Sequence, residues 1–416
     1  MRGLTPLEAG AHAAFARRLE PGSRRPLAVA LSGGGDSLAL TLIADAWARR
    51  AGRDLVVLTV DHRLQAASAD WTQACRAHAE RLARPFRSLA WDGEKPAPVA
   101  PAVARAARHR LLAEAAREAG AEVILMGHTA DDRLEAVAMR AAGATTPEPR
   151  EWAPSPAWPE GRRLFLLRPL LAARRSELRD WLRARGAAWI DDPANADLRF
   201  ARPRARPTAA TSPDPPPPVE VELALARQVA EETCALILPR AAFRAAEPAE
   251  AARLLAMACV CAGGGARLPD GARVGRLAQA LTTEGPVAAT LAGARVRAHA
   301  TLIRIAREAG EAARGGLAPV AVQPGRAAIW DGRFEIEAER PVTVRATAGL
   351  AARLPPAQRR RLLALPAGER GALPVVTDSD GRMESPVLGA VAGVRVTPLA
   401  AERLRAASGL VTRERA

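Results

Sequence analysis

The hydrophobic residues in the first half of the chain form short continuous runs that alternate with longer segments of helical spacing. The runs have the length and composition of strands buried in a parallel sheet, and they occupy residues 28–31, 55–60 and 123–126. The segments between them place apolar residues three and four positions apart, as amphipathic helices do, at 37–50, 68–82 and 102–118. Strands that alternate with helices in this way predict an α/β domain with a doubly wound parallel sheet.

The alternation continues after residue 160. An apolar run at 164–167 predicts a further strand, which ends in Arg168. Ser176 then precedes residues of helical spacing, so we expect it to cap a helix that continues to Arg185.

A proline-rich stretch divides the chain. Residues 207–218 have the composition of a stiff, extended linker, so we expect the first domain to span 1–206. Beyond the linker we expect a mainly helical accessory domain over 219–312, helical up to about residue 261 and followed by short strands. A small α+β domain is expected over 313–416.

The first strand runs into a glycine-rich turn and then into a helix. Glycine allows close approach of the backbone and positive φ, and the helix start adds several N–H groups and a positive dipole end. Such a turn is typical of a phosphate site, although a tight βα turn with no ligand is the simpler interpretation. The turn consists of Ser32, Gly33, Gly34, Gly35, Asp36 and Ser37.

Polar residues also follow the next strands. Ligands of doubly wound sheets bind beyond the carboxyl ends of the strands, so we expect these residues near the turn. They are Asp61 and His62 after the second strand, and Gly127, His128, Asp131, Asp132 and Glu135 after the third. A histidine with three carboxylates on one helical face could hold Mg²⁺ and move protons. Helix capping by acidic residues is the alternative.

Charge and cysteine content narrow the class of protein. The formal net charge is +15, which favours an extended anionic partner such as a nucleic acid, with a merely soluble basic surface as the alternative. The four cysteines lack the spacing of a zinc or iron–sulfur site. The first residues lack a signal-peptide core, and no apolar run has the length of a membrane span. We therefore expect a cytoplasmic protein with no membrane partner.

These motifs resemble those of a known superfamily. Residues 32–37 match the S-G-G-x-D-S loop of the PP-loop N-type ATP pyrophosphatases, a class with an α/β core. Within that class the chain is similar to the tRNA(Ile)-lysidine synthases. Residues 104–110 resemble their A-R-x-x-R-Y pattern with His109 for tyrosine, and 127–136 resemble G-H-x-x-D-D-x-x-E-T. Residues 192–206 match D-P-S-N-x-D-x-x-F-x-R-N-x-x-R in register at seven positions.

The resemblance implies a reaction. ATP would adenylate the C2 oxygen of the wobble cytidine in a CAU-anticodon tRNA(Ile), with Mg²⁺ as cofactor. The amine of free L-lysine would then displace AMP to give lysidine. By resemblance the protein would also form a homodimer.

Roles for individual residues follow from this resemblance and from their chemistry. The residues expected to act in catalysis are Asp36, Arg108, His128 and Asp132. Those expected to bind ATP are Ser32, Gly33, Gly34, Gly35, Asp36, Ser37, Asp61, His62 and Gly127. Asp36 and Asp131 are the candidate metal ligands, and Asp132 and Glu135 the candidate lysine site. The residues expected to bind tRNA are Arg105, Arg108, Arg168, Asn195, Arg202 and Arg206.

Two alternatives remain at this point. One is another PP-loop enzyme, such as a tRNA thiolase or an amide-forming synthetase, which the cysteine pattern and the 192–206 segment disfavour. The other is an RNA-binding homologue whose nucleotide site has decayed. The residues at which the sequence departs from the family pattern would support it: Thr59, Gln65, Ala136 and Ala194.

Overall fold

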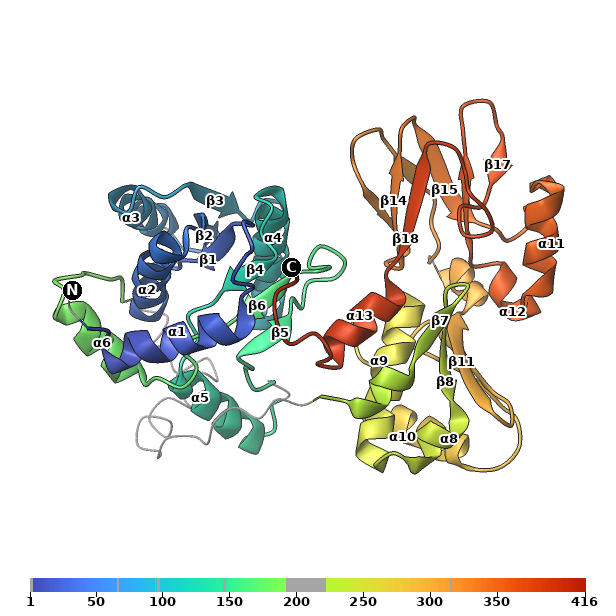
Figure 1. The fold of residues 1–416 in the computed structure, drawn as a ribbon, viewed down its shortest axis with the longest axis horizontal. Helices are drawn as coiled ribbons and strands as arrows, with labels where there is room; N and C mark the ends of the chain where they lie inside the picture. The colour runs from blue at the N-terminus through green and yellow to red at the C-terminus, as the bar shows by residue number, and fades with distance from the viewer. Residues whose placement is uncertain are drawn as a thin grey trace. The chain divides into compact units, whose positions relative to one another are not determined.

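The computed structural model describes two compact units (Figure 1). The first comprises Met1–Glu220 together with Val411–Ala416, and the second comprises Val221–Leu410. The residues described are 3–65, 67–93, 95, 98–144, 147–191, 222–314 and 316–416. The predicted linker 207–218 lies outside them.

A six-stranded sheet forms the centre of the first unit, in the order β3-β2-β1-β4-β6-β5. Neighbouring strands are parallel except β5, which is antiparallel to β6. Their bounds are β1 Leu27–Ala30, β2 Leu55–Asp61, β3 Phe86–Ala90, β4 Val123–Leu125, β5 Trp152–Pro154 and β6 Phe165–Leu167. From β1 the chain moves outward to β3 and then returns to the other side of β1 as β4. This reversal confirms the predicted doubly wound sheet and places a topological switch point between β1 and β4.

Helices cover both faces of this sheet. Their bounds are α1 Pro6–Arg18, α2 Gly35–Ala51, α3 Ser68–Arg81, α4 Pro101–Glu118, α5 Ala130–Ala141 and α6 Arg175–Arg183. Alternate strand residues such as Ala28 and Leu58 pack with Leu112 and Ala116 of α4 in one buried cluster. Because side chains alternate along a strand, Leu27 and Val29 point to the opposite face, which α2 and α3 cover (Figure 1).

The second unit contains three antiparallel sheets and short helices. One sheet has the order β7-β8-β11-β10-β9, and smaller sheets have the orders β12-β15-β16-β17 and β13-β14-β18. The strands are β7 Ala230–Glu232, β8 Ala235–Pro239, β9 Val287–Leu291, β10 Ala294–Ala298, β11 Leu302–Arg307, β12 Val320–Val322, β13 Ala328–Trp330, β14 Phe334–Ala338, β15 Val342–Ala346, β16 Pro374–Thr377, β17 Met383–Glu384 and β18 Val394–Pro398. The α-helices are α8 Arg240–Ala245, α9 Pro248–Gly263, α10 Gly271–Thr282, α11 Pro356–Ala364, α12 Ala367–Arg370 and α13 Ala400–Ala407. The 3₁₀ helices are η2 Ala224–Gln228, η3 Ala309–Arg314 and η4 Ala351–Arg353.

Two local predictions were wrong. The segment expected to be helical up to about residue 261 contains the strands β7 and β8. The prediction failed because a five-residue apolar run such as Ala235–Pro239 fits a buried strand and a buried helix equally well. Ser176 does not cap α6. That helix begins at Arg175, and the N–H of its N-cap residue Arg174 donates to Glu177. The separation of residues 219–312 from 313–416 stays a prediction.

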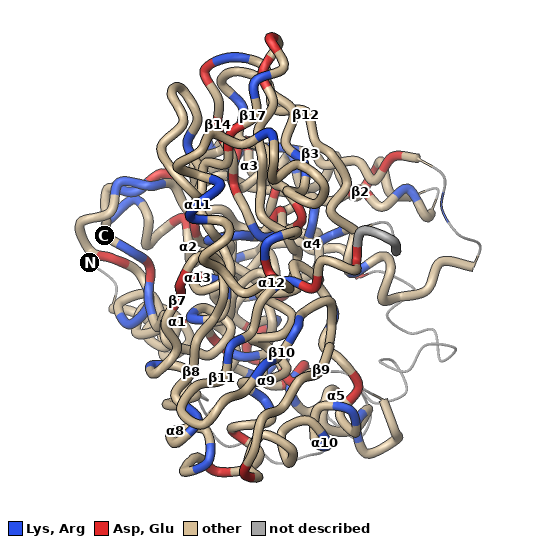
Figure 2. Tube along the Cα trace, turned by 90° about the vertical axis from the view of Figure 1, so that its right-hand side faces the viewer, with Lys and Arg blue, Asp and Glu red and all other residues tan. Residues whose placement is uncertain are grey.

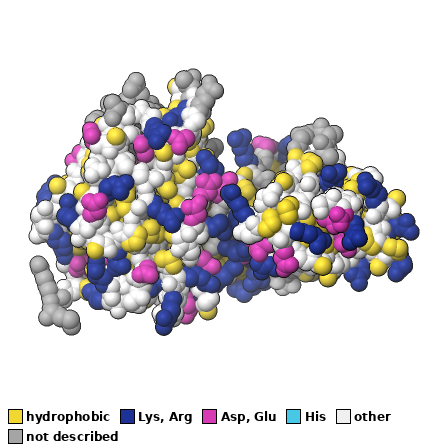
Figure 3. All heavy atoms as spheres, turned by 90° about the horizontal axis from the view of Figure 1, so that it is seen from above, with side chains coloured by type: hydrophobic (Ala, Val, Ile, Leu, Met, Phe, Trp, Pro, Cys, Tyr) yellow, Lys and Arg dark blue, Asp and Glu magenta, His cyan; other side chains and the backbone are white. Residues whose placement is uncertain are grey.

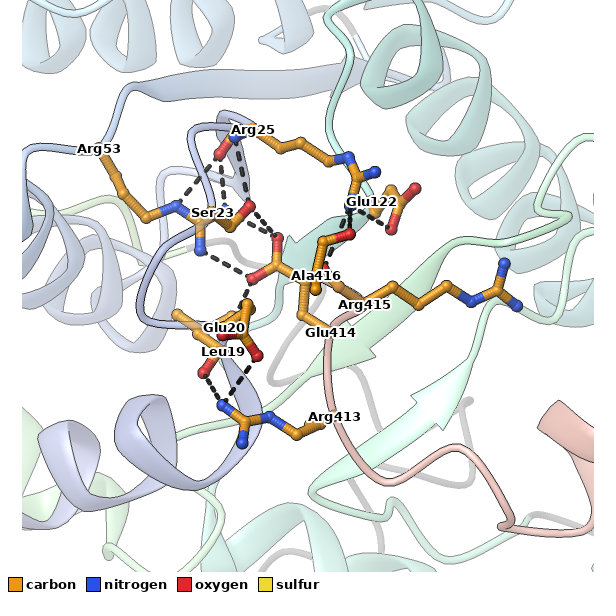
Figure 4. A network of polar contacts seen from close by, with 10 residues as sticks. All are labelled: Leu19, Glu20, Ser23, Arg25, Arg53, Glu122, Arg413, Glu414, Arg415 and Ala416. Atoms are coloured by element: carbon orange, nitrogen blue, oxygen red, sulfur yellow. Dashed lines mark hydrogen bonds and ion pairs between the residues drawn. The ribbon is translucent and has the colours of Figure 1, made fainter.

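The last six residues return to the first unit (Figure 4). The Glu414 carboxylate accepts a hydrogen bond from each terminal nitrogen of Arg53, both at 2.8 Å, and one from the Ser23 hydroxyl at 3.2 Å. The side chains of Arg53 and Glu414 are almost completely buried. Trp152 Nε1 donates to the carbonyl of Val411 at 2.8 Å. These contacts make the tail an integral part of the first unit.

We expect Glu414→Gln to destabilise the first unit. Removing one partner of a buried ion pair leaves the Arg53 guanidinium without a compensating charge, at a cost of about 3 kcal/mol. Denaturant titration of the full chain, followed by hydrogen exchange of amides in β1 and β2, measures the loss. Glu118→Gln is the matched control, because Glu118 pairs with Arg87 on the surface and we expect less than about 1 kcal/mol there. Equal losses in the free energy of unfolding for the two substitutions would contradict a stabilising role for the Arg53–Glu414 ion pair.

Candidate active site

The glycine-rich turn connects β1 to α2 at the switch point. Gly33 has φ +85°, a conformation that residues with a Cβ rarely adopt. The Ser37 hydroxyl closes the turn from inside, since it donates to the Gly34 carbonyl at 2.9 Å and accepts from the Ser32 N–H at 3.1 Å. Gly34 is the N-cap of α2, and no side chain in the described part of the chain caps that helix. The first N–H groups of α2 are therefore available to an anion.

Gly127 brings the end of β4 against this turn. A Cβ placed on Gly127 would lie 2.9 Å from both Cα and N of Ser37, which is closer than real Cβ contacts. The backbone after β4 thus packs directly on the first turn of α2. The structure brings together the two segments that the sequence predicted to meet.

Arg175, at the start of α6, joins the carboxylates of the site. Its Nε donates to Asp36 at 3.0 Å, and one terminal nitrogen donates to Glu135 at 3.0 Å. The other terminal nitrogen lies 3.7 Å from Asp132. Its main-chain N–H donates to Asp131 at 2.7 Å. Four of the five acidic residues that the sequence singled out, all except Asp61, therefore contact one arginine.

Arg175 was not among the predicted site residues. Two features of the sequence could have identified it. It follows β6, whose carboxyl end lies at the same edge of the sheet as those of β1 and β4. A group of carboxylates also requires a cation when it is buried.

Burial and neighbouring charges oppose each other in this group. Burial raises the pKa of Asp36, and the nearby Asp132 raises it further, whereas Arg175 lowers it. Burial also disfavours the charge of Arg175, but Asp36, Asp132 and Glu135 outweigh it and raise the pKa of the guanidinium. Arg175 consequently remains a cation.

Two of these carboxylates also cap helices. Asp132 accepts from the N–H of Thr129 at 2.8 Å and from its hydroxyl at 3.0 Å, which closes the start of α5. Asp131 accepts the first N–H of α6. The capping interpretation therefore holds for Oδ2 of Asp131 and for Oδ2 of Asp132. The other oxygen of Asp132, Oδ1, faces Arg175.

A basic group lies beside His128. Arg168 Nε donates to His128 Nδ1 at 3.1 Å, so that ring nitrogen carries no proton and Nε2 carries one. Burial lowers the pKa of Arg168 to about 9, and Arg105, Arg150 and Arg108 lie close enough to contribute. Such crowded guanidinium groups favour an anionic ligand.

His109 belongs to the same basic group. Burial lowers its pKa to about 2, with further contributions from Arg108, Arg105 and Arg168. The ring is therefore neutral. Its Nε2 is buried without a hydrogen-bond partner among the described residues. The predicted arginines of α4 and the arginine after β6 thus lie together, next to the acidic group.

Asp61 and His62 lie at the end of β2. The N–H of Arg63 donates to Asp61 at 2.8 Å, which fixes the turn after the strand. The His62 ring contacts Trp91 edge-on, with ring centroids 6.0 Å apart. Burial lowers the pKa of His62, and Arg108 lowers it further. Asn195, Arg202 and Arg206 lie outside the described residues, as does the rest of the 192–206 segment.

A divalent cation fits this site in one way. Within the described ranges, no three His, Cys, Asp or Glu side chains are arranged to hold a metal ion. Mg²⁺ in nucleotide-binding sites usually takes one or two carboxylates and completes its shell with phosphates and water. Asp36, in the first turn of α2, fits that role. Asp131 fits it less well, because its Oδ2 already accepts from Arg175.

A mostly parallel sheet with a glycine-rich turn at its switch point is the architecture of nucleotide-binding α/β enzymes. A family model described as a PP-loop domain matches residues 8–210. The chain is 46% identical to a tRNA(Ile)-lysidine synthase of Caulobacter vibrioides over 97% of this chain and 98% of that one. It is 37% identical to one of Rhizobium meliloti over 78% and 76%, and 34% identical to one of Hyphomonas neptunium over 74% and 89%. The chain belongs to the tRNA(Ile)-lysidine synthase family.

Among the residues that the structure describes, none of the helices combines the length and the apolar character needed to span a membrane.

We expect Gly127→Ala to weaken ATP binding. The new methyl group would meet main-chain atoms of Ser37, which cannot turn away as a flexible side chain could, so the first turn of α2 must shift. A shift of this kind misplaces the N–H groups that would face the phosphates. Each charge-assisted hydrogen bond contributes about 1.5–3 kcal/mol, so we expect the affinity for ATP to fall at least about 10-fold.

Isothermal titration with a non-hydrolysable ATP analogue measures this loss. Gly10→Ala in α1 is the control, because a Cβ there has open space around it. An unchanged affinity in a folded Gly127→Ala protein would show that the close packing is irrelevant to the nucleotide.

Proposed function

We propose that this chain forms lysidine in tRNA(Ile). ATP adenylates the C2 oxygen of the wobble cytidine in the CAU anticodon and releases pyrophosphate. The amine of free L-lysine then attacks C2 and releases AMP. One observation supports this proposal above the others: a turn suited to phosphate lies beside a group of four acidic residues, which suits a reaction between a nucleotide and a cationic amine.

The turn would hold ATP. We infer that the N–H groups at the start of α2 contact the phosphates, with Gly127 setting the position of that helix start. Mg²⁺, when bound, would offset the charge that develops between the α- and β-phosphates, and Asp36 would supply a ligand for it. Asp61 and His62, at the end of β2, would border the nucleotide.

The acidic group would receive the lysine amine. Asp132 and Glu135 attract the ammonium group, and one of these carboxylates takes the proton that the amine must lose before it attacks. His128 cannot accept that proton at Nδ1, because Arg168 already donates there. The part of His128 in catalysis stays a prediction from the sequence.

The basic group would bind the RNA. Arg105, Arg108 and Arg168 can neutralise a phosphate near the cytidine, and Arg108 would also offset charge on the activated base. Lys and Arg residues occur along both units, with acidic residues among them (Figure 2). Figure 3 shows side chains of both charges interspersed on one face of the molecule. With the net charge of +15, this distribution supports a role for the second unit in holding the tRNA. Asn195, Arg202 and Arg206 would extend the same contact.

A cytoplasmic location and a homodimer are part of the proposal.

Pyrophosphate release tests the reaction. We expect release from ATP only with CAU-anticodon tRNA, and incorporation of labelled lysine into the tRNA. Asp36→Asn should lower the rate at least about 100-fold, because it removes a charge at the reacting phosphates. Asp54→Asn, at an exposed position before β2, is the control and should leave the rate unchanged.

The alternatives predict different results. Tight tRNA binding without turnover would favour a decayed RNA-binding protein. Pyrophosphate release that depends on a sulfur donor and not on lysine would favour a thiolase.

A further inference from the structure

The Arg175 side chain occupies the centre of the acidic group that the proposed function assigns to the lysine amine. Its three guanidinium nitrogens face carboxylates from two different helices, Asp36 on α2 and Asp132 and Glu135 on α5. Those carboxylates are the groups that any incoming cation would need. A guanidinium and a second cation compete for the oxygens of these carboxylates, because two cations at the same oxygens would repel each other.

Two contacts hold the starts of α5 and α6 without the Arg175 guanidinium. Asp132 caps α5 through Thr129, and that contact involves no atom of Arg175. The main-chain N–H of Arg175 anchors α6 to Asp131, and this contact persists in any variant with another side chain at the position. The guanidinium adds the positive charge that the acidic group faces, through its ion pairs with Asp36 and Glu135.

The guanidinium can also leave. Its side chain keeps 18% of its surface exposed, whereas the Glu135 side chain keeps 1%. Its contact with Asp132, at 3.7 Å, is an ion pair without a hydrogen bond. Because the main chain is fixed at Asp131, the side chain can turn about its own bonds while α6 stays in place.

We propose that Arg175 is a built-in competitor for the cationic ligand of this site. In the ligand-free protein its guanidinium occupies the cation position between Asp36 and Glu135, and an incoming cation displaces it. The cation is either the ammonium group of lysine or a divalent metal ion that accompanies ATP. Arg175 thus sets the affinity for that cation and keeps the carboxylates paired until it arrives. The inference rests on the proposed function.

Binding to Arg175→Gln tests the proposal, without tRNA so that no turnover occurs. In one arm, equilibrium dialysis measures labelled L-lysine. In the other, calorimetry measures Mg²⁺ in the presence of a non-hydrolysable ATP analogue. We expect the variant to bind one of these cations about 10-fold more tightly than the natural sequence, and the arm that changes identifies the cation. Arg175→Lys, which retains the charge, should restore most of the natural affinity.

Arg183→Gln is the matched control. Arg183 lies eight residues, or about 12 Å, further along α6 and pairs with Asp180 at the surface. Its substitution removes the same charge from the same helix, away from the acidic group. We expect less than a 2-fold change in either arm. Thermal unfolding of each variant separates a binding effect from a folding defect.

Other outcomes overturn the proposal in distinct ways. Unchanged binding of both cations by a folded Arg175→Gln protein would refute it. Weaker binding would also refute it and would make Arg175 a contact of the ligand itself. A large loss of thermal stability would make it a structural bridge. If the natural sequence forms lysidine but the variant binds no more tightly, only this inference fails. If the natural sequence neither binds lysine nor incorporates it, the proposed function fails, and the Mg²⁺ arm still decides whether Arg175 competes.

Discussion

The contact between Gly127 and the first turn of α2 determines how the site is built. It joins the ends of β1 and β4, the two strands on either side of the switch point. Helix α5 begins three residues after Gly127, so this close packing helps to set where its carboxylates lie relative to the glycine-rich turn. A side chain at residue 127 would separate the two halves of the chemistry, which explains why glycine is required on structural grounds alone.

Charge in the site is divided into two adjoining groups. The carboxylates of α5 and Asp36 surround Arg175, while Arg105, Arg108 and Arg168 gather beside His128. Asp132 lies close enough to Arg168 to oppose the lowering of its pKa, so the groups are in electrostatic contact. An acidic group beside a basic group suits a reaction that brings an amine to a nucleic acid. The arrangement also means that no single charged residue acts independently of its neighbours.

The sequence predicts the sheet well and the connections less well. Continuous apolar runs identified β1, β2 and β4, and the glycine turn located the switch point, because both signals are local. β7 and β8 were missed, since the apolar run of Ala235–Pro239 has no periodicity that separates strand from helix. Arg175 was missed for another reason. A cation that pairs with carboxylates from helices 40 and 139 residues away has no local pattern. The predicted cap at Ser176 also assigned the helix start to the wrong residue.

The path of the C-terminal tail changes what counts as a domain in this chain. Residues 411–416 pack in the first unit, so the second unit is an insertion within the first rather than an appendage to it. Both ends of the inserted segment are thereby joined to the same folded body. A protein cut after residue 220 would consequently lack Glu414, and Arg53 would be left as a buried cation without its counter-ion. A minimal catalytic fragment has to be assembled from two separate pieces of sequence, or connected across the insertion by a short artificial link.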